Sequence, residues 1–314
     1  MTKKTRRPSW ASSFLSIVRY ELLWNIRKKK LIGVLVLAFA FATISLALPV
    51  FLRNMNNQPT NPNPDYVIAS GTGIGGFAFF LFALVSVMNS ISGEFESGSI
   101  IPLLTKPVSR TTVYLGKFCA ALVTVIGAYA LLIIYLAAGG YIIYGPQNNL
   151  HLISITLLGS IISTLVWMSI VLAVGSVSKS SMLAALLGIG IWLGLNIVAV
   201  TLSAFSNQAS ALTFLPGSGA SGILNVSGPS NQTSVSTGTD SIGSLLTSYI
   251  LNPIADVTFF RMEIDPVRMI INRIPMYTEP LSLVVARSIA VTGVYILVFN
   301  FIAWYALKRA QIKE

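Results

Sequence analysis

The sequence predicts an all-α membrane protein with six transmembrane helices, an N-terminal helix at the membrane surface and a large extracellular loop between helices 5 and 6. The first observation is composition, because 54% of the residues are hydrophobic, only 10% are charged and the mean hydropathy is +0.75. A soluble domain carries charge on roughly a quarter of its positions. The second observation is a set of apolar runs near the roughly 20 residues that cross a bilayer. A backbone in lipid satisfies its own hydrogen bonds, so each run should be helical.

Six spans are predicted within a single domain, residues 1–314. They cover residues 31–52, 67–91, 118–144, 152–177, 182–205 and 286–307. The segments between and around them are a tail with the surface helix (1–30), a cytoplasmic loop (92–117) and the extracellular loop (206–285).

The third observation is where the basic residues fall. If both termini are cytoplasmic, the inner segments carry a large positive excess, whereas the outer segments are close to neutral. This asymmetry is typical of a plasma-membrane protein with both ends inside. The net charge of +11 is then explained by topology and by attraction to anionic membrane lipids, not by nucleic-acid binding.

The N-terminal segment is expected to form a helix in the inner headgroup layer. After a basic start, Phe14, Ile17, Val18, Leu22 and Ile26 recur at helical spacing. The alternative is a plain basic tail that only enforces topology. No cleavable signal peptide is expected.

The outer segments differ in size and character. Residues 53–66 are rich in Asn and Pro and predict an exposed connector, while 145–151 predicts little more than a turn. In the large loop, the part through Asp240 is dominated by Ser, Gly, Thr and Asn and predicts a flexible or loosely packed excursion. The apolar runs that follow are too short to cross and predict re-entrant or surface helices. They cover residues 242–250, 254–260 and 269–274.

Two sequons in this loop make Asn225 and Asn231 candidate glycosylation sites in a host that modifies surface proteins. The motif is short enough to arise by chance in a stretch rich in Asn and Ser.

No enzymatic motif is found in the sequence. Residues 71–76 match a dinucleotide-type glycine pattern, but no strand precedes them, so helix packing is the better explanation. Gly116-Lys117 is not a Walker loop, because Phe118 replaces the required Ser or Thr. His151 is interpreted as an interfacial side chain, and the single Cys119 excludes an intrachain disulfide. We therefore expect no catalytic activity, bound cofactor or metal in this chain.

The predicted spans contain no Asp, Glu, Lys, Arg or His away from their ends. This argues against a proton-coupled carrier and an intramembrane protease, both of which need such groups at depth. Asn196 and Asn300 are the notable polar residues within the spans. Each is interpreted either as a helix-bridging hydrogen-bond former or as part of a substrate path.

The loop between the second and third spans has the layout of a short amphipathic helix offered to a partner. Glu94 and Glu96 follow the second span, and an apolar patch then includes Leu103 and Leu104. A turn at Lys106-Pro107 leads into the basic start of the next span.

This loop also carries a resemblance to a known family. The segment Ile91-Ser-Gly-Glu-Phe-Glu-Ser-Gly-Ser-Ile-Ile-Pro-Leu-Leu-Thr-Lys-Pro-Val-Ser-Arg110, followed by Leu115-Gly-Lys117, resembles the signature of ABC-2 type permeases. The segment Val18-Arg-Tyr-Glu-Leu22 with Arg27 is similar to the elbow helix of that family.

The resemblance implies a permease subunit of an ABC exporter that pairs with a second copy or a related permease and with two ATPase subunits. The ATPase partner would bind ATP-Mg. Glu94, Glu96, Leu103, Leu104 and Arg110 would belong to the element that docks on the ATPase, and Lys179 would make a smaller contact. The alternative is a membrane anchor or scaffold that holds an extracellular assembly and transports nothing.

Overall fold

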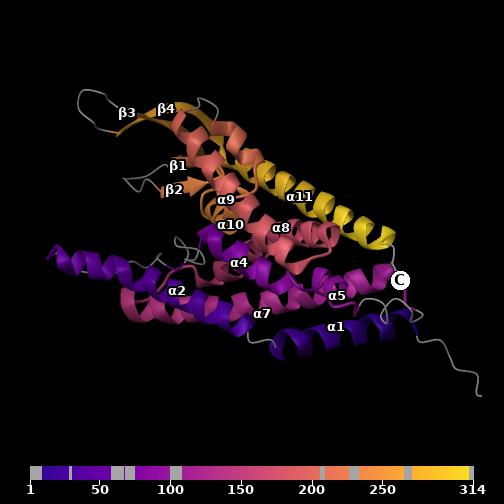
Figure 1. The fold of residues 1–314 in the computed structure, drawn as a ribbon. Coiled ribbons are helices and arrows are strands. Elements are labelled where there is room, and N and C mark those ends of the chain that lie inside the picture. Colours follow the sequence, from indigo (N-terminus) through magenta and orange to yellow (C-terminus); the bar gives the residue numbers. More distant parts are fainter. Residues whose placement is uncertain are drawn as a thin grey trace, which may run out of the picture.

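A computed structural model of the chain describes residues 9–27, 30–57, 67, 75–99, 108–205, 209–225, 233–264 and 271–310. Long helices make up most of the molecule, and a small β-sheet covers one end of the bundle (Figure 1). The helices are α1 (Trp10–Arg27), α2 (Lys30–Met55), α4 (Gly75–Val87), α5 (Ser92–Glu96), α7 (Arg110–Tyr144), α8 (Ile153–Ser178), α9 (Ser181–Phe205), α10 (Ile242–Leu251) and α11 (Leu281–Arg309). Three short 3-10 helices are η1 (Leu150–Leu152), η2 (Ala209–Phe214) and η3 (Thr239–Ser241).

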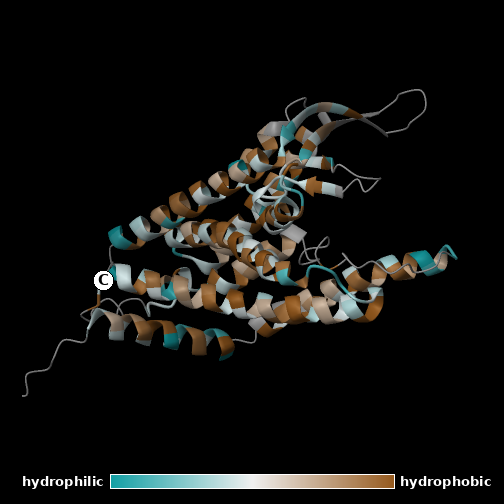
Figure 2. Cartoon of the chain, turned by 180° about the vertical axis from the view of Figure 1, so that it is seen from behind, coloured by the Kyte–Doolittle hydropathy of each residue, from teal (hydrophilic) through white to brown (hydrophobic). Residues whose placement is uncertain are grey.

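The prediction of six spans is confirmed among the described residues. Six helical stretches are long and apolar enough to cross a membrane. They are Ala38–Met55, Phe77–Glu96, Arg110–Tyr144, Leu150–Ser178, Ser181–Ala199 and Leu281–Arg309. The sixth helix begins at Leu281, five residues before the predicted start. In Figure 2, the long helices are coloured mostly brown, for hydrophobic residues, and teal, hydrophilic residues occur toward several of their ends.

Helix α8 forms the centre of the bundle. Its Trp167, Val166 and Met168 are fully buried, and Tyr129 of α7 and Phe82 of α4 pack in the same core. Helix α8 carries no charged side chain on any face and can be surrounded by other helices, whereas α9 leaves most of its apolar surface uncovered.

The prediction of an all-α fold is wrong for the segment between α9 and α11. This segment contains an antiparallel sheet in the order β2-β1-β3-β4. Its strands are β1 (Ser221–Asn225), β2 (Thr233–Ser236), β3 (Asp256–Ile264) and β4 (Ile271–Pro280). The run at 254–260 was expected to be a surface helix but contributes to β3, where Val257 and Phe259 are buried and alternate with less buried neighbours. Such a period of two suits a half-buried strand and not a helix.

The described residues of the loop through Asp240, 209–225 and 233–240, are also more ordered than predicted. Leu212, Ala220 and Val235 are buried in a second core beneath the sheet. The Thr237 hydroxyl donates to the Ala220 carbonyl and accepts from its amide, both at 3.1 Å. Side-chain hydroxyl groups thus satisfy the backbone of a segment whose composition indicated flexibility.

The run at 242–250 does form the predicted helix, α10, which packs against α8. The two backbones approach so closely at Gly159 and Gly243 that a Cβ on Gly159 would overlap the Gly243 backbone. This contact fixes the sheet end of the bundle onto its central helix.

Candidate coupling site at the α5 end of the bundle

The described residues among those predicted to contact an ATPase, Glu94, Glu96, Arg110 and Lys179, lie at the end of the bundle opposite the sheet. Five-residue helix α5 turns there between α4 and α7, and α1 runs alongside the first part of α7 (Figure 1). Leu103 and Leu104 lie outside the described residues.

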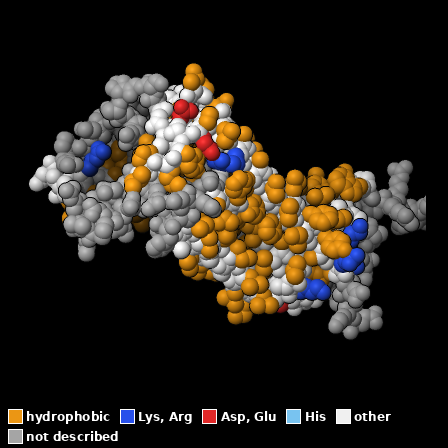
Figure 3. Space-filling view, turned by 90° about the horizontal axis from the view of Figure 1, so that it is seen from above, with side chains coloured by type: hydrophobic (Ala, Val, Ile, Leu, Met, Phe, Trp, Pro, Cys, Tyr) orange, Lys and Arg blue, Asp and Glu red, His pale blue; other side chains and the backbone are white. Residues whose placement is uncertain are grey.

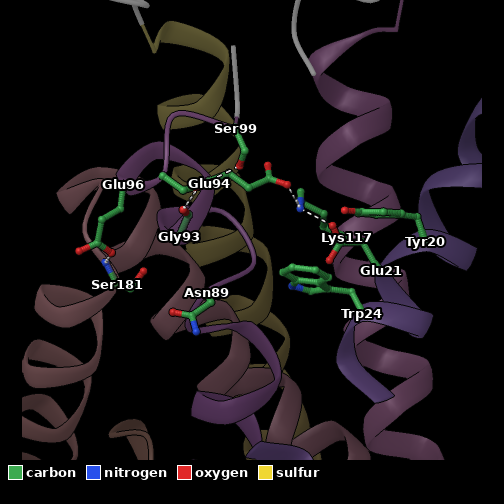
Figure 4. A pocket seen from close by; sticks show the side chains of 11 residues that line it. Tyr20, Glu21, Trp24, Asn89, Gly93, Glu94, Glu96, Ser99, Lys117 and Ser181 are labelled. Atoms are coloured by element: carbon green, nitrogen blue, oxygen red, sulfur yellow. Dashed lines mark hydrogen bonds and ion pairs between the residues drawn. The ribbon is translucent and has the colours of Figure 1, made fainter. Parts of the chain in front are cut away.

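The centre of this site is Lys117, whose side chain is only 3% exposed. Its ammonium donates to Glu21 of α1 at 2.5 Å and to Glu94 of α5 at 2.7 Å. Figure 4 shows Lys117 between the two carboxylates. A buried cation with two carboxylate partners ties three elements together, because separating any pair would leave a charge without compensation.

Close helix packing positions this network. The Ile17 side chain of α1 lies against Gly116 of α7, and a Cβ at Gly116 would come within 2.7 Å of it. The absence of a side chain at Gly116 therefore lets α1 approach α7 where Glu21 meets Lys117.

The other side of α5 is held by the turn between α8 and α9. The Glu96 carboxylate accepts a hydrogen bond from the Ser181 amide at 3.1 Å, at the start of α9. Lys179 adopts a left-handed conformation that ends α8, and its ammonium lies 5.6 Å from the centre of the Phe95 ring. A carboxylate at a helix N-terminus is favoured by the helix dipole.

Arg110 connects the same region to the end of α11. Its Nη1 donates to the carbonyl oxygens of Leu307, Lys308 and Ala310 at 3.3, 2.8 and 2.9 Å. The last carbonyls of a helix have no i+4 amide to accept from, although the Leu307 carbonyl also accepts from the Ala310 amide at 3.3 Å. The structure thus gives Arg110 an internal partner, and its contact with an ATPase stays a prediction.

A cavity of about 520 Å³ opens beside the network. Its lining comes from α1, α5, α7 and the start of α9, and Trp24 and Asn89 face it along with Glu21, Glu94 and Lys117 (Figure 4). Its lining includes the exposed residues Glu96, Ser97 and Ser99 on the α5 side and Tyr20 and Trp24 on the α1 side.

The remaining predicted residues lie elsewhere. Asn300 accepts from the Tyr114 hydroxyl at 2.5 Å and donates to Ser169 Oγ at 2.6 Å, which bridges α7, α8 and α11 as the hydrogen-bonding interpretation expected. Asn196 donates to the Trp192 carbonyl within its own helix. Asn225 is exposed at the end of β1, and Asn231 lies outside the described residues.

Glu21 was missed as a site residue, and Lys117 was given no role. The sequence does show that Glu21 and Lys117 have opposite charges and that each lies beside an apolar run. Sequence alone did not show that these runs pack side by side.

Comparison with known proteins fits this architecture. Residues 15–312 match the model of a family described as ABC-2 family transporter protein. The chain is 32% identical over 117 residues to the probable ABC transporter permease protein NosY of Pseudomonas aeruginosa, which covers 36% of this chain and 42% of that protein. It is 30% identical over 189 residues to the protein of the same name from Stutzerimonas stutzeri, which covers 54% of this chain and 65% of that one. The chain thus matches less than two thirds of the length of either relative. Together with the six membrane-crossing helices, the family match over nearly the whole sequence shows that the chain belongs to the ABC-2 family of transporter permeases.

Proposed function

We propose that this chain is the membrane subunit of an ABC exporter whose ATP is hydrolysed by a separate ATPase subunit. The observation that supports the proposal is the set of contacts made by α5 at its end of the bundle. There, the short helix α5 contacts α7 through Glu94 and the start of α9 through Glu96, and Lys117 of α7 connects it further to Glu21 of α1. A push on α5 from an ATPase would therefore reach several spans at once.

In this proposal the α5 end is cytoplasmic and the sheet is extracellular. Lys308, Arg309, Arg110 and Lys179 all lie toward the α5 end. Figure 3 shows basic side chains gathered at this end, beyond a broad band of apolar ones. Positive charge on the cytoplasmic side is the usual arrangement in membrane proteins.

Helix α1 then lies at the cytoplasmic membrane surface as the elbow helix. One face packs on α7, whereas Trp10, Tyr20 and Trp24 are exposed together with Arg19 and Arg27. Exposed aromatic rings beside basic residues suit the headgroup region of a bilayer.

The docking surface is the exposed rim formed by Glu96, Ser97, Gly98 and Ser99, with Lys179 beside it. Glu94 and Arg110 make internal contacts, so their part would be to position this rim. Substitutions at the rim itself are therefore the sharper test.

The experiment uses Cys119→Ser protein, in which single cysteines are introduced. Ser97→Cys should form a cross-link with a co-expressed ATPase and should resist a membrane-impermeant thiol reagent added to intact cells. The matched control is Ser234→Cys, on the exposed face of β2, which should show the opposite pattern. Labelling of Ser97→Cys from outside, or cross-linking through Ser234→Cys, would overturn the proposal.

We place a second permease copy, or a related permease, against α9. Only 11% of its apolar window is buried, and a Cβ at Gly190 or Gly194 would have nothing within 4 Å. Small residues let a partner helix approach closely. Gly190→Cys should therefore give a disulfide-linked dimer in membranes, and Gly127→Cys, which also has open space around it on α7, serves as the control.

The alternative of an anchor without transport activity gains no support from the comparisons. Both relatives are named as transporter permeases.

A further inference from the structure

An acidic side chain from the sheet-end loop reaches the middle of the helix bundle. The anchor segment, Thr237–Ser241, follows β2 and includes η3. Ser163 of α8 donates to the Thr239 carbonyl at 2.7 Å, and Ser288 of α11 donates to the Thr237 carbonyl at 2.7 Å. Trp167 of α8 donates its indole N–H to the Asp240 carboxylate at 3.0 Å.

The depth of this carboxylate follows from its partner. Helix α8 spans Ile153–Ser178, so with a rise of about 1.5 Å per residue Trp167 lies about 16 Å from Ser178 and about 21 Å from Ile153. The apolar layer of a bilayer is about 30 Å thick. Asp240 therefore lies near mid-height of the central helix, although no predicted span contains an acid away from its ends.

The hydrogen-bond donors to this carboxylate are neutral. They are Trp167, which is fully buried, and the Thr239 hydroxyl at 3.4 Å. In the described residues of the elements around the anchor segment, α4 and α8 contain no charged side chain and α10 contains only Tyr249 as a titratable group. Tyr129 of α7 is bonded to Thr164 and interacts electrostatically with Asp240. The titratable groups of α11 are Arg287, paired with Glu279 at 2.7 Å; Tyr295, bonded to the Phe214 carbonyl; and Tyr305, Lys308 and Arg309 at the far end of the helix. The other titratable side chains of α7 are Arg110, Tyr114, Lys117, Cys119, Tyr135, Tyr141 and Tyr144.

Asp240 is half-buried, and a carboxylate held among neutral donors is costly in its ionised form, because no cation among the described residues pairs with it. Burial accordingly raises the pKa of Asp240 to about 7, against the lowering effect of the hydrogen bonds from Trp167 and Thr239. The protonated acid keeps a carbonyl oxygen that can accept the Trp167 hydrogen bond.

Trp167 also contacts the helices on the other side of α8. Its ring lies 5.6 Å, edge to face, from Phe80 of α4, and the Phe80 ring stacks at 5.7 Å on Trp192 of α9. Movement of the anchor segment would therefore disturb an aromatic chain that reaches α4 and α9.

We propose that Asp240 is a proton-binding site inside the bundle, and that its proton keeps the anchor segment seated between α8 and α11. Loss of this proton favours release of the anchor segment and loosening of the sheet end of the bundle. This site is independent of any ATPase contact at the α5 end.

The test is hydrogen–deuterium exchange of the Thr237–Ser241 amides in purified protein, corrected for the pH dependence of intrinsic exchange. From about pH 5.5 to about pH 8.5, the protection of these amides should fall roughly thirtyfold. This ratio follows from linkage for a carboxyl with a pKa of about 7 when seated and about 3.9 when released. Asp240→Asn should abolish the dependence, whereas Asp256→Asn, at an exposed position on β3, should preserve it.

A second variant guards against misfolding of Asp240→Asn. Trp167→Phe removes a donor that favours the charged carboxylate, so the loss of protection should shift to higher pH. Unchanged protection across this pH range in the unmodified chain would overturn the proposal. An equal pH dependence in Asp240→Asn would also overturn it.

Discussion

Replacing Lys117 with Met should be among the most damaging single changes at the α5 end. The substitution keeps the length of the side chain but removes the cation that lies between Glu21 and Glu94. The Lys117 side chain is 3% exposed and that of Glu21 is 8% exposed, so water cannot replace the lost partner. Removing one member of a buried pair costs about 3–5 kcal/mol. Glu94 is 20% exposed and can be hydrated in part, so the main penalty should come from Glu21.

Thermal unfolding in detergent measures this loss. The matched control is Lys308→Met at the same end, where the ammonium lies 4.8 Å from the Trp304 ring and the expected loss is about 0.5–1 kcal/mol. The double variant Lys117→Met with Glu21→Gln should recover much of the stability, because it removes the buried charge along with its partner. The reasoning fails if Lys117→Met is no less stable than the control, or if the double variant is less stable than the single one.

Three further predictions follow from named contacts. Gly159→Ala should destabilise the protein by more than about 2 kcal/mol, because the new methyl group would overlap the Gly243 backbone. Gly127→Ala, whose new methyl group would have nothing within 4 Å, should be neutral or slightly stabilising. Thermal unfolding of both variants checks this. Arg110→Gln should lose about 1–2 kcal/mol and speed hydrogen exchange in the last turn of α11, since a charged donor to three carbonyls is removed. Because the folded-state pKa of Asp240 is raised to about 7, the protonated carboxyl contributes fully to stability below about pH 4. The free energy of unfolding should then fall by up to about 4 kcal/mol as the pH rises to about 7. Asp240→Asn should flatten this part of the stability–pH profile.

The limits of sequence reasoning are clearest in the loop between α9 and α11. Ser, Thr and Gly lowered its apparent capacity to form a core, so the segment through Asp240 was predicted to be loose. In the structure, their hydroxyl groups bond to the backbone, and Leu212, Val235 and Phe259 form a core beneath the sheet. Strand pairing depends on contacts between β1 and β3, which lie more than thirty residues apart, as the pairing of Asn225 with Asp256 shows. Composition over a local window does not report such contacts.

The same limit applied to Asp240. The sequence shows that no acid lies in the middle of a predicted span, and this absence argued against a proton-coupled carrier. The structure brings an acid to mid-height of α8 from a neighbouring loop. A survey confined to the spans misses a group that enters the bundle from outside them.

By itself, the sequence determined the membrane class, the six helices and the family, because the bilayer imposes a length and an apolar composition on each span and the 91–117 signature is local. Only the tertiary structure decided that Lys117 lies between Glu21 and Glu94, that Arg110 meets the end of α11, and that Asp240 contacts Trp167. These contacts join residues 23 to 200 positions apart. Their energies come from burial and pairing of charges and hydrogen-bonding groups, which exist only once the helices have packed.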